Sequence, residues 1–334
     1  MKNYSLYIGI DVSKLKLDIS ILNPVTFTSE HFVIENTTRD IKLFTKQLIK
    51  KGIDPKSVLF CCENTGYYTN HLLFTFLDMQ LDLWIVPAIE IKRSKGLSRG
   101  KSDKVDAKDI ASYSFKNLEK LCLSEMVDKD IQKLKLLYTE REKMMKSLLI
   151  METTSESKSF IDKEVYKEVA SLNLSLINKI KSSIHKIERK IQMIIKSNEK
   201  LYKQAELIQS IPGIGVQTTT YLIIATKGFT AFTNWRKFAC YSGIAPFEYT
   251  SGSSIKGRTK VNHIADKKMK SLLQMCAMTT IKYDPQIREY YQKKRNEGKN
   301  AMLVLNNVRC KLVSRIFAVV QRESPYVNTY KFVS

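Results

Sequence analysis

Two acidic residues stand at the ends of segments that are otherwise apolar. Asp11 follows the apolar residues 6–10, and Glu63 follows the apolar residues 58–62. An ionised carboxylate at the end of a buried strand is costly unless it is paired or bound to metal, although Asp11 could also simply cap a turn. On neighbouring strands, Asp11 and Glu63 would converge on one Mg²⁺, a hard cation that prefers oxygen ligands.

A third acidic cluster follows Ser102, whose type and position predict a helix N-cap. Asp103 and Asp106 are three residues apart and share one helical face, as do Asp106 and Asp109, so Asp109 is an alternative to Asp106. Alone, this cluster also fits a solvated helix start. Together with the two strand-end residues, four carboxylates can hold two metal ions about 4 Å apart, Mg²⁺ or Mn²⁺, for phosphodiester chemistry.

The charge of the chain indicates the substrate. The 334 residues carry 55 basic and 33 acidic side chains, a net charge of +22. Residues 1–115 hold 16 basic and 13 acidic side chains, which leaves 39 and 20 for the rest, a net charge of +19. Such an excess favours nucleic-acid binding, with solubility alone as the alternative. The charge is too widely spread for a membrane-surface anchor.

Other classes are disfavoured by composition. The six cysteines are scattered without a C-x-x-C pair, and only four histidines are present, so neither a zinc site nor a disulfide scaffold is expected. No apolar run approaches the ~20 residues of a membrane helix. Residues 1–4 run straight into a strand-like segment, so we expect no signal peptide and a cytoplasmic protein that associates with the nucleoid.

The elements that must position these residues follow from the hydrophobic pattern. Residues 4–115 are predicted to form an α/β domain, with a boundary near residue 120. The order is three strands, helix, strand, helix, strand, which is typical of a mixed sheet like that of ribonuclease H. The strands are expected at 4–12, 15–22, 29–36, 58–63 and 81–86, and the helices at 39–51 and 68–79.

Residues 125–205 form a strongly helical stretch with the spacing of a coiled coil. Apolar residues recur every three or four positions from Ile177 to Leu201, with Asn198 as a register device in the seam. A preceding helix at 128–156 has a similar face. The two helices pair with each other, or the isoleucine seam joins protomers, and we expect both.

Residues 206–334 are predicted to form a mostly helical C-terminal domain, with helices at 269–281 and 302–322. Residues 208–215, followed by an apolar helix, have a helix-hairpin-helix pattern, in which Gly213 and Gly215 allow backbone N–H groups to hold a DNA phosphate. A Gly/Ser stretch at 250–254 then precedes the basic residues of a short run. These basic residues are Lys256, Arg258 and Lys260.

Six motifs occur along the chain in an order that resembles one known family. They are Gly9-Ile10-Asp11-Val12-Ser13, Glu63-Asn64-Thr65-Gly66, Lys101-Ser102-Asp103-Lys104-Val105-Asp106-Ala107, Ile211-Pro212-Gly213-Ile214-Gly215, Ser242-Gly243-Ile244-Ala245-Pro246 and Ser251-Gly252. Across essentially its whole length, the chain resembles the transposases of the insertion-sequence one-ten family, relatives of the pilin-gene invertases.

The resemblance implies a function and a set of site residues. It implies an N-terminal domain like the Holliday-junction resolvase RuvC, with a metal-binding D-E-D-D tetrad, and a C-terminal domain whose serine attacks DNA. The tetrad falls on Asp11, Glu63, Asp103 and Asp106, and the serine on Ser251. The family further implies a bridge RNA that pairs with the element ends and the target DNA. It also implies dimers or tetramers in which tetrad and serine come from different protomers.

The chain departs from the family pattern in two places. Thr250 replaces the first serine of the S-S-G motif, and residues 265–270 replace the usual G-N-x-x-L-R. Ser253 and Ser254 compete with Ser251 as nucleophile. Two rival functions stay open: a resolvase-like Mg²⁺-dependent nuclease that uses water in place of the serine, and a non-enzymatic nucleic-acid-binding protein that needs none of the four carboxylates.

Overall fold

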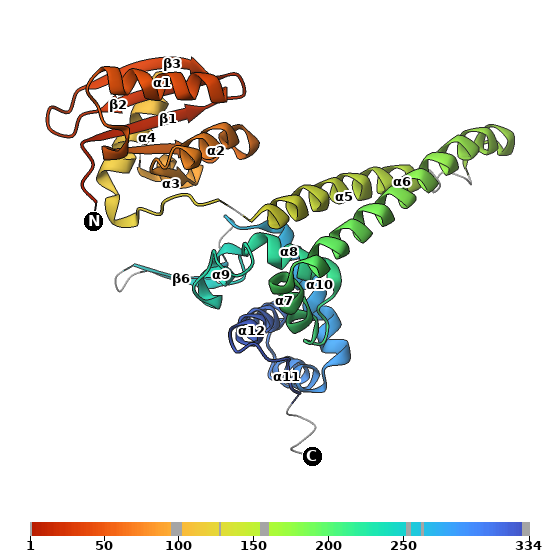
Figure 1. The fold of residues 1–334 in the computed structure, drawn as a ribbon. Coiled ribbons are helices and arrows are strands. Elements are labelled where there is room, and N and C mark those ends of the chain that lie inside the picture. Colours follow the sequence, from red (N-terminus) through yellow and green to blue (C-terminus); the bar gives the residue numbers. More distant parts are fainter. Residues whose placement is uncertain are drawn as a thin grey trace. The chain divides into compact units, whose positions relative to one another are not determined.

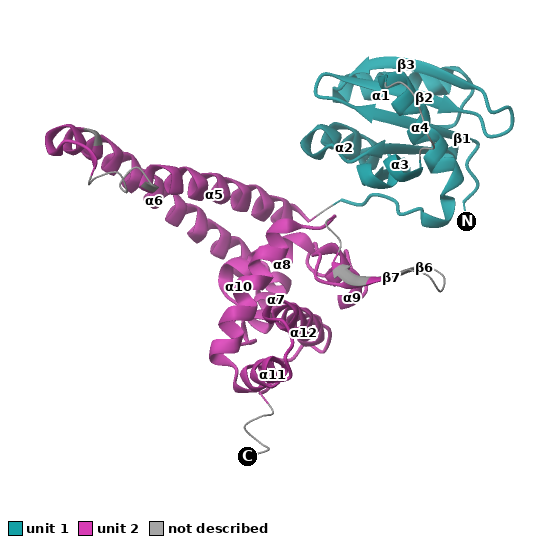
Figure 2. Cartoon of the chain, turned by 180° about the vertical axis from the view of Figure 1, so that it is seen from behind, with its two compact units in different colours: residues 1–126 teal, residues 127–334 magenta. Residues whose placement is uncertain are grey.

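The computed structural model describes residues 2–94, 102–126, 128–153, 160–251, 255–261 and 264–328. The chain divides into two compact units, residues 1–126 and residues 127–334, which are coloured separately in Figure 2. Each unit has its own core. The long helices predicted as a separate domain belong to the second unit.

The first unit is built on one five-stranded sheet (Figure 1). Its strands are β1 (Leu6–Val12), β2 (Lys16–Leu22), β3 (Ser29–Glu35), β4 (Val58–Glu63) and β5 (Leu83–Val86). Their order is β3-β2-β1-β4-β5, with antiparallel pairing among the first three strands of the chain and parallel pairing from β1 to β4 to β5. The prediction of a mixed sheet is therefore confirmed.

Helices cover both faces of this sheet. They are α1 (Thr38–Lys50), α2 (Asn70–Asp78), α3 (Ala88–Ser94) and α4 (Asp103–Lys116). Alternation along β1 divides its side chains between the two faces. Ile8 and Ile10 join the core under α1 and α2, whereas Tyr7 joins the core under α3 and α4.

Helix α4 lies directly on β1 because Gly9 has no side chain. A Cβ atom at Gly9 would stand 2.2 Å from the carbonyl oxygen of Ala107 and 2.2 Å from the amide nitrogen of Ala111. Asp11 is two residues beyond Gly9 on the same strand, so it shares the face that α4 covers. The small residues of β1 and α4 thus bring the first turn of α4 towards the end of β1.

The second unit begins with two long helices, α5 (Lys129–Thr153) and α6 (Lys163–Ser197), which lie side by side in Figure 1. Polar contacts show that the two helices are antiparallel. The Arg141 Nε donates to Glu188 at 2.7 Å, and the Lys181 ammonium lies 2.9 Å from Glu152. The helices therefore pair within the chain; winding as a coiled coil and pairing between protomers remain predictions.

The predicted seam does not run unbroken to Leu201. Helix α6 ends at Ser197, and Asn198 has extended backbone angles, φ −106° and ψ 105°. Its side-chain oxygen accepts from the Leu201 amide as the N-cap of α7 (Glu199–Gln209), and its amide nitrogen donates to Asp130 at 3.1 Å. Asn198 is thus a helix cap, because its short polar side chain accepts from a backbone amide that the first turn of α7 leaves free. Its assignment to the helical seam was wrong.

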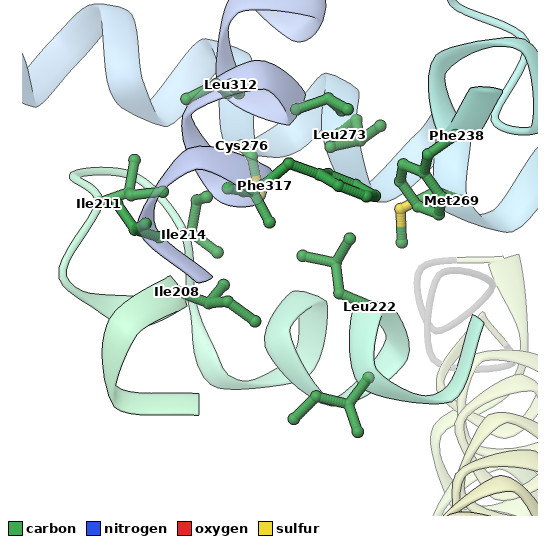
Figure 3. Close-up of a cluster of buried hydrophobic side chains, with 14 of the residues drawn as sticks. Ile208, Ile211, Ile214, Leu222, Phe238, Met269, Leu273, Cys276, Leu312 and Phe317 are labelled. Carbon is green, nitrogen blue, oxygen red and sulfur yellow. The ribbon is translucent and has the colours of Figure 1, made fainter. Parts of the chain in front are cut away.

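The helices of the second unit share one apolar core, part of which is drawn in Figure 3. The remaining helices are α8 (Val216–Ala225), α9 (Trp235–Tyr241), α10 (Lys267–Tyr283), α11 (Pro285–Asn296) and α12 (Ala301–Gln321). Ile208 of α7, Leu222 of α8, Phe238 of α9, Leu273 of α10 and Leu312 of α12 are fully buried. None of the helices within the described ranges is long and apolar enough to cross a membrane.

Between α9 and α10 the chain forms a two-stranded antiparallel ribbon of β6 (Pro246–Ser251) and β7 (Ile255–Val261). From the sequence, only a Gly/Ser stretch and a basic run were expected here. The ribbon is closed at its base, because the Asp266 amide donates to the Tyr241 carbonyl at 2.9 Å and the Tyr241 hydroxyl donates to Asp266 Oδ2 at 2.9 Å.

Candidate active site

Two of the predicted carboxylates meet at one edge of the sheet. Ile10 of β1 pairs with Cys62 of β4 in a parallel ladder, so Asp11 and Glu63 are the next residues along the two strands. In a parallel pair, residues in register point to the same face. Both strands therefore present a carboxylate at their carboxyl ends, on the face that carries α4, and both residues are partly buried.

Helix α4 supplies the other two carboxylates from its first turn. Ser102 caps the helix by accepting from the Val105 amide at 3.3 Å, as predicted, and Asp103 and Asp106 are the acidic residues of that turn. A helix N-terminus favours negative charge, so this position suits acidic residues. Asp106 is partly buried and Asp103 is exposed.

The other three carboxylates all lie near enough to act on the electrostatics of Asp11. Burial raises its pKa from 3.8 to about 6, and the negative charges of Asp106, Asp103, Glu63 and Asp18 contribute to this rise in that order. Desolvation and nearby like charges both disfavour the ionised carboxyl. Among the described residues, Asp106 is therefore one of the groups that raise the pKa of Asp11. Asp109, the alternative to Asp106, is not shown to be among those groups.

The cluster has the donor chemistry of a divalent cation site. Its members all offer carboxylate oxygens, which suit Mg²⁺ or Mn²⁺, and the repulsion seen at Asp11 is what a bound cation would relieve. Across the described ranges, however, no three acidic, histidine or cysteine side chains gather closely enough to hold one ion. The residue types therefore suit a divalent metal ion, but binding one would require their side chains to move closer together.

Three further residues at this edge were not predicted from the sequence. Asp18 of β2 pairs with Asp11 in the antiparallel register and is buried, and it accepts from His31 Nε2 at 3.0 Å and from the Lys16 ammonium at 3.0 Å. Lys16 also lies 2.7 Å from Asp103. The signal was present, since Lys16, Asp18 and Ser20 alternate with apolar residues and form one polar face on a central strand.

The candidate nucleophile and the basic run belong to the β6–β7 ribbon of the second unit. Ser251 is the last residue of β6, and its backbone pairs with Ile255; Thr250 pairs with Lys256, and Lys260 pairs with Phe247. Arg258 lies between these two lysines on β7. The ribbon thus puts Ser251 and Lys256 near its tip. The side chains of Ser251, Thr250 and the three basic residues, and all of Gly252, Ser253 and Ser254, lie outside what the structure describes.

The two glycines of the predicted helix-hairpin-helix have different surroundings. Gly213 has a φ of +91°, and a Cβ there would stand 2.2 Å from Thr280 Oγ1, so this glycine serves a close approach to α10. Gly215 is the exposed N-cap of α8, where a Cβ would meet open space. The free amides at the start of α8 are therefore next to Gly215, and a phosphate contact there remains a prediction.

Comparison with known proteins defines the class of the chain. Residues 8–157 match a family model described as a transposase, of the DEDD type named for IS110, and residues 205–292 match the model of the Transposase IS116/IS110/IS902 family. The two matches cover both units and contain all four carboxylates. The chain is a transposase.

Its relatives identify the family. The chain is 26% identical to the pilin gene-inverting protein of Moraxella bovis over 324 residues, which are 96% of this chain and 97% of that protein. It is 26% identical over 140 residues to a 43.6 kDa protein of insertion element IS110 from Streptomyces coelicolor, covering 42% of this chain and 34% of that protein. The chain belongs to the IS110 family of transposases, which confirms the resemblance seen in the sequence.

Proposed function

We propose that this transposase moves its own insertion sequence by cutting and rejoining DNA with two cooperating centres. The first is the acidic cluster of Asp11, Glu63, Asp103 and Asp106, which we propose binds Mg²⁺, with Mn²⁺ as a substitute. The second is Ser251 on the ribbon. The observation that carries this proposal is the convergence of the four carboxylates: Asp11 and Glu63 follow the paired residues Ile10 and Cys62, and α4, which carries Asp103 and Asp106, packs on β1 at Gly9.

Bound divalent metal would supply Lewis-acid stabilisation of charge at the phosphate. The protein residues do the rest. Asp11 and Glu63 on the sheet, with Asp103 and Asp106 on α4, would supply the donor oxygens, and the cluster would bind a cation most tightly when Asp11 has lost its proton. Lys256, Arg258 and Lys260 bring positive charge to the strand beside Ser251, where they can stabilise negative charge that develops on phosphorus.

The serine step conserves the phosphodiester bond energy. The Ser251 oxygen forms a bond to phosphorus while the bond from phosphorus to the leaving sugar oxygen breaks. The hydroxyl proton passes to a base, and the leaving oxygen takes up one proton. Serine is a weak nucleophile at its free pKa, so it needs activation by the acidic centre. We propose that this centre comes from another protomer of a dimer or tetramer.

The partners of this reaction would be nucleic acids and further copies of the chain. A bridge RNA encoded by the element would pair with donor and target DNA, and the positive charge beyond residue 116 would hold both nucleic acids. The hairpin of α5 and α6 would join protomers as a coiled coil, between an RuvC-like domain at 1–120 and a transposase domain at 206–334. Gly215, with Gly213 shaping the turn, would present amides to a phosphate. The reaction would take place in the bacterial cytoplasm, on the nucleoid.

The acidic centre is tested by removing single carboxylates. Asp11→Asn and Asp106→Asn should abolish strand cleavage while DNA and RNA binding survive, because the binding charge lies mostly in the other unit. Asp78→Asn is the matched control, an exposed aspartate of the same unit that forms an ion pair with Lys42 on the surface. Near-normal cleavage by Asp106→Asn would move the fourth role to Asp109. Normal cleavage by both variants would favour the non-enzymatic rival.

The serine is tested by the covalent adduct. Complete reactions should contain a protein–DNA adduct that resists denaturation and maps by peptide mass to Ser251. Ser251→Ala should abolish the adduct and recombination together and keep assembly on nucleic acid, with Ser253→Ala and Ser254→Ala as matched controls. An adduct at Ser253 or Ser254 would correct the residue. Cleavage without any adduct would favour the resolvase-like nuclease that uses water.

A further inference from the structure

Lys16 occupies a place among the carboxylates of the acidic edge. Its ammonium nitrogen lies 2.7 Å from Asp103 Oδ2 and 3.0 Å from Asp18 Oδ2. These distances are typical of charge-assisted hydrogen bonds. The Lys16 ammonium of β2 is therefore bound to Asp103 of α4, which is one of the four candidate metal ligands.

The two carboxylates that hold Lys16 differ in how firmly they are fixed. Asp18 is 7% exposed, pairs in register with Asp11 and accepts from His31, so it holds the ammonium in a fixed place on the sheet. Asp103 is 53% exposed and begins α4. Because Asp18 is fixed, the ion pair with Lys16 draws the more exposed partner Asp103 to the ammonium.

The competing demands on Asp103 decide what Lys16 does. A carboxylate oxygen that accepts a hydrogen bond from an ammonium has to give up that bond, or share it, before it can coordinate a metal ion. Lys16 is 47% exposed, so the pair is screened and weak enough for a divalent cation to displace.

We propose that Lys16 is a built-in counter-ion that competes with the divalent metal for Asp103 and so sets the metal affinity of the site. This inference depends on the proposed metal-binding role of the acidic cluster. Lys16 acts through Asp103 and Asp18, which makes it a positioning residue. Its role has two sides: it relieves repulsion among the carboxylates when metal is absent, and it raises the metal concentration that the enzyme needs.

The test measures Mn²⁺ binding to the full chain in the absence of DNA. Binding is detected as a loss of the electron paramagnetic resonance signal of free Mn²⁺. Lys16→Met should tighten Mn²⁺ binding by roughly three- to tenfold, because one screened ion pair no longer competes. Lys16→Arg keeps the charge and should retain the affinity of the wild type. Lys14→Met, an exposed lysine two residues earlier, is the matched control and should change nothing.

The variant Asp11→Asn separates the two levels of the proposal. If Asp11→Asn binds Mn²⁺ as the wild type does, the proposed metal site fails and this inference with it. If Asp11→Asn weakens binding but Lys16→Met leaves it unchanged or weaker, only the role of Lys16 is overturned. Unfolding temperatures in EDTA identify any variant that does not fold, and Lys16→Gln then replaces Lys16→Met. A loss of DNA affinity with unchanged Mn²⁺ affinity would assign Lys16 to a DNA phosphate instead.

Discussion

Gly9 of β1 and Ala107 of α4 are in backbone contact, so close that a Cβ atom on Gly9 would stand 2.2 Å from the Ala107 carbonyl oxygen. This contact fixes the distance between strand and helix. Two residues beyond Gly9 the strand presents Asp11, and one residue before Ala107 the helix presents Asp106. The approach of the two acidic residues therefore depends on the absence of one side chain.

Replacing Gly9 with alanine should separate the strand from the helix. Because backbone atoms of α4 block the added methyl group, the helix must shift, and we expect unit 1 to lose about 1–3 kcal/mol of stability in urea unfolding. Strand cleavage should fall as well. Gly52→Ala is the control, since a Cβ atom there meets open space. Its φ of +78° is unfavourable for alanine, so this variant should lose about 1–2 kcal/mol of stability without moving α4. It should leave cleavage unchanged, and equal losses of cleavage for the two variants would contradict the role assigned to this contact.

The places of Asp11 and Glu63 in the fold were predictable, for reasons that single residues make clear. Asp11 and Glu63 end apolar runs, and their strands lie side by side because the order of elements favours one sheet topology. Lys16 and His31 were not predicted, because their contacts with Asp18 depend on which strands pair and in which register. The ribbon was missed because its glycine and serine residues match a loop locally, whereas the bonds between Tyr241 and Asp266 that close it form only in the folded unit.

The pKa of Asp11 predicts a pH dependence of stability. The pKa is raised from 3.8 to about 6 in the folded state, so between these values the folded protein binds more protons than the unfolded chain. This residue therefore lowers stability as pH rises from about 4 to 6, and the penalty is complete above 6. Asp11→Asn should remove the penalty, and at pH 7 in EDTA we expect unit 1 to unfold roughly 2–8 °C above the wild type.

The measurement is the difference in unfolding temperature between wild type and Asp11→Asn from pH 4 to pH 8, which isolates this residue from other titrating groups. The difference should be small at pH 4 and grow towards pH 6.5. Asp78→Asn, at an exposed position, should show no such growth. A variant that is less stable than the wild type at pH 7 would contradict the raised pKa.

The Tyr241 hydroxyl should control the order of the ribbon that carries Ser251. Tyr241→Phe removes the 2.9 Å bond to Asp266 at the ribbon base and leaves the aromatic packing in place. We expect faster amide hydrogen exchange across β6 and β7, with slower recombination and unchanged assembly on nucleic acid. Tyr202→Phe is the matched control, because its hydroxyl donates to Glu206 within α7. Equal exchange in the ribbon for both variants would show that this bond does not hold its base.

The uneven charge of the chain predicts a steep salt dependence of nucleic-acid binding. With a net +19 beyond residue 115, contacts to roughly 6–10 phosphates are expected, so raising the salt from 50 to 200 mM should weaken binding by about 10³–10⁵-fold.

The ribbon's share of this salt dependence can be measured with the triple variant Lys256→Gln, Arg258→Gln and Lys260→Gln. If each side chain contacts one phosphate, the slope of log affinity against log salt should become shallower by about 2.7, since each contact contributes about 0.9. The triple variant Lys42→Gln, Lys46→Gln and Lys50→Gln on α1 removes the same charge from exposed positions of unit 1 and should leave the slope unchanged. Equal slopes for the two triple variants would mean that total charge, and not the ribbon, governs binding. A binding constant that does not respond to salt would contradict the charge argument altogether.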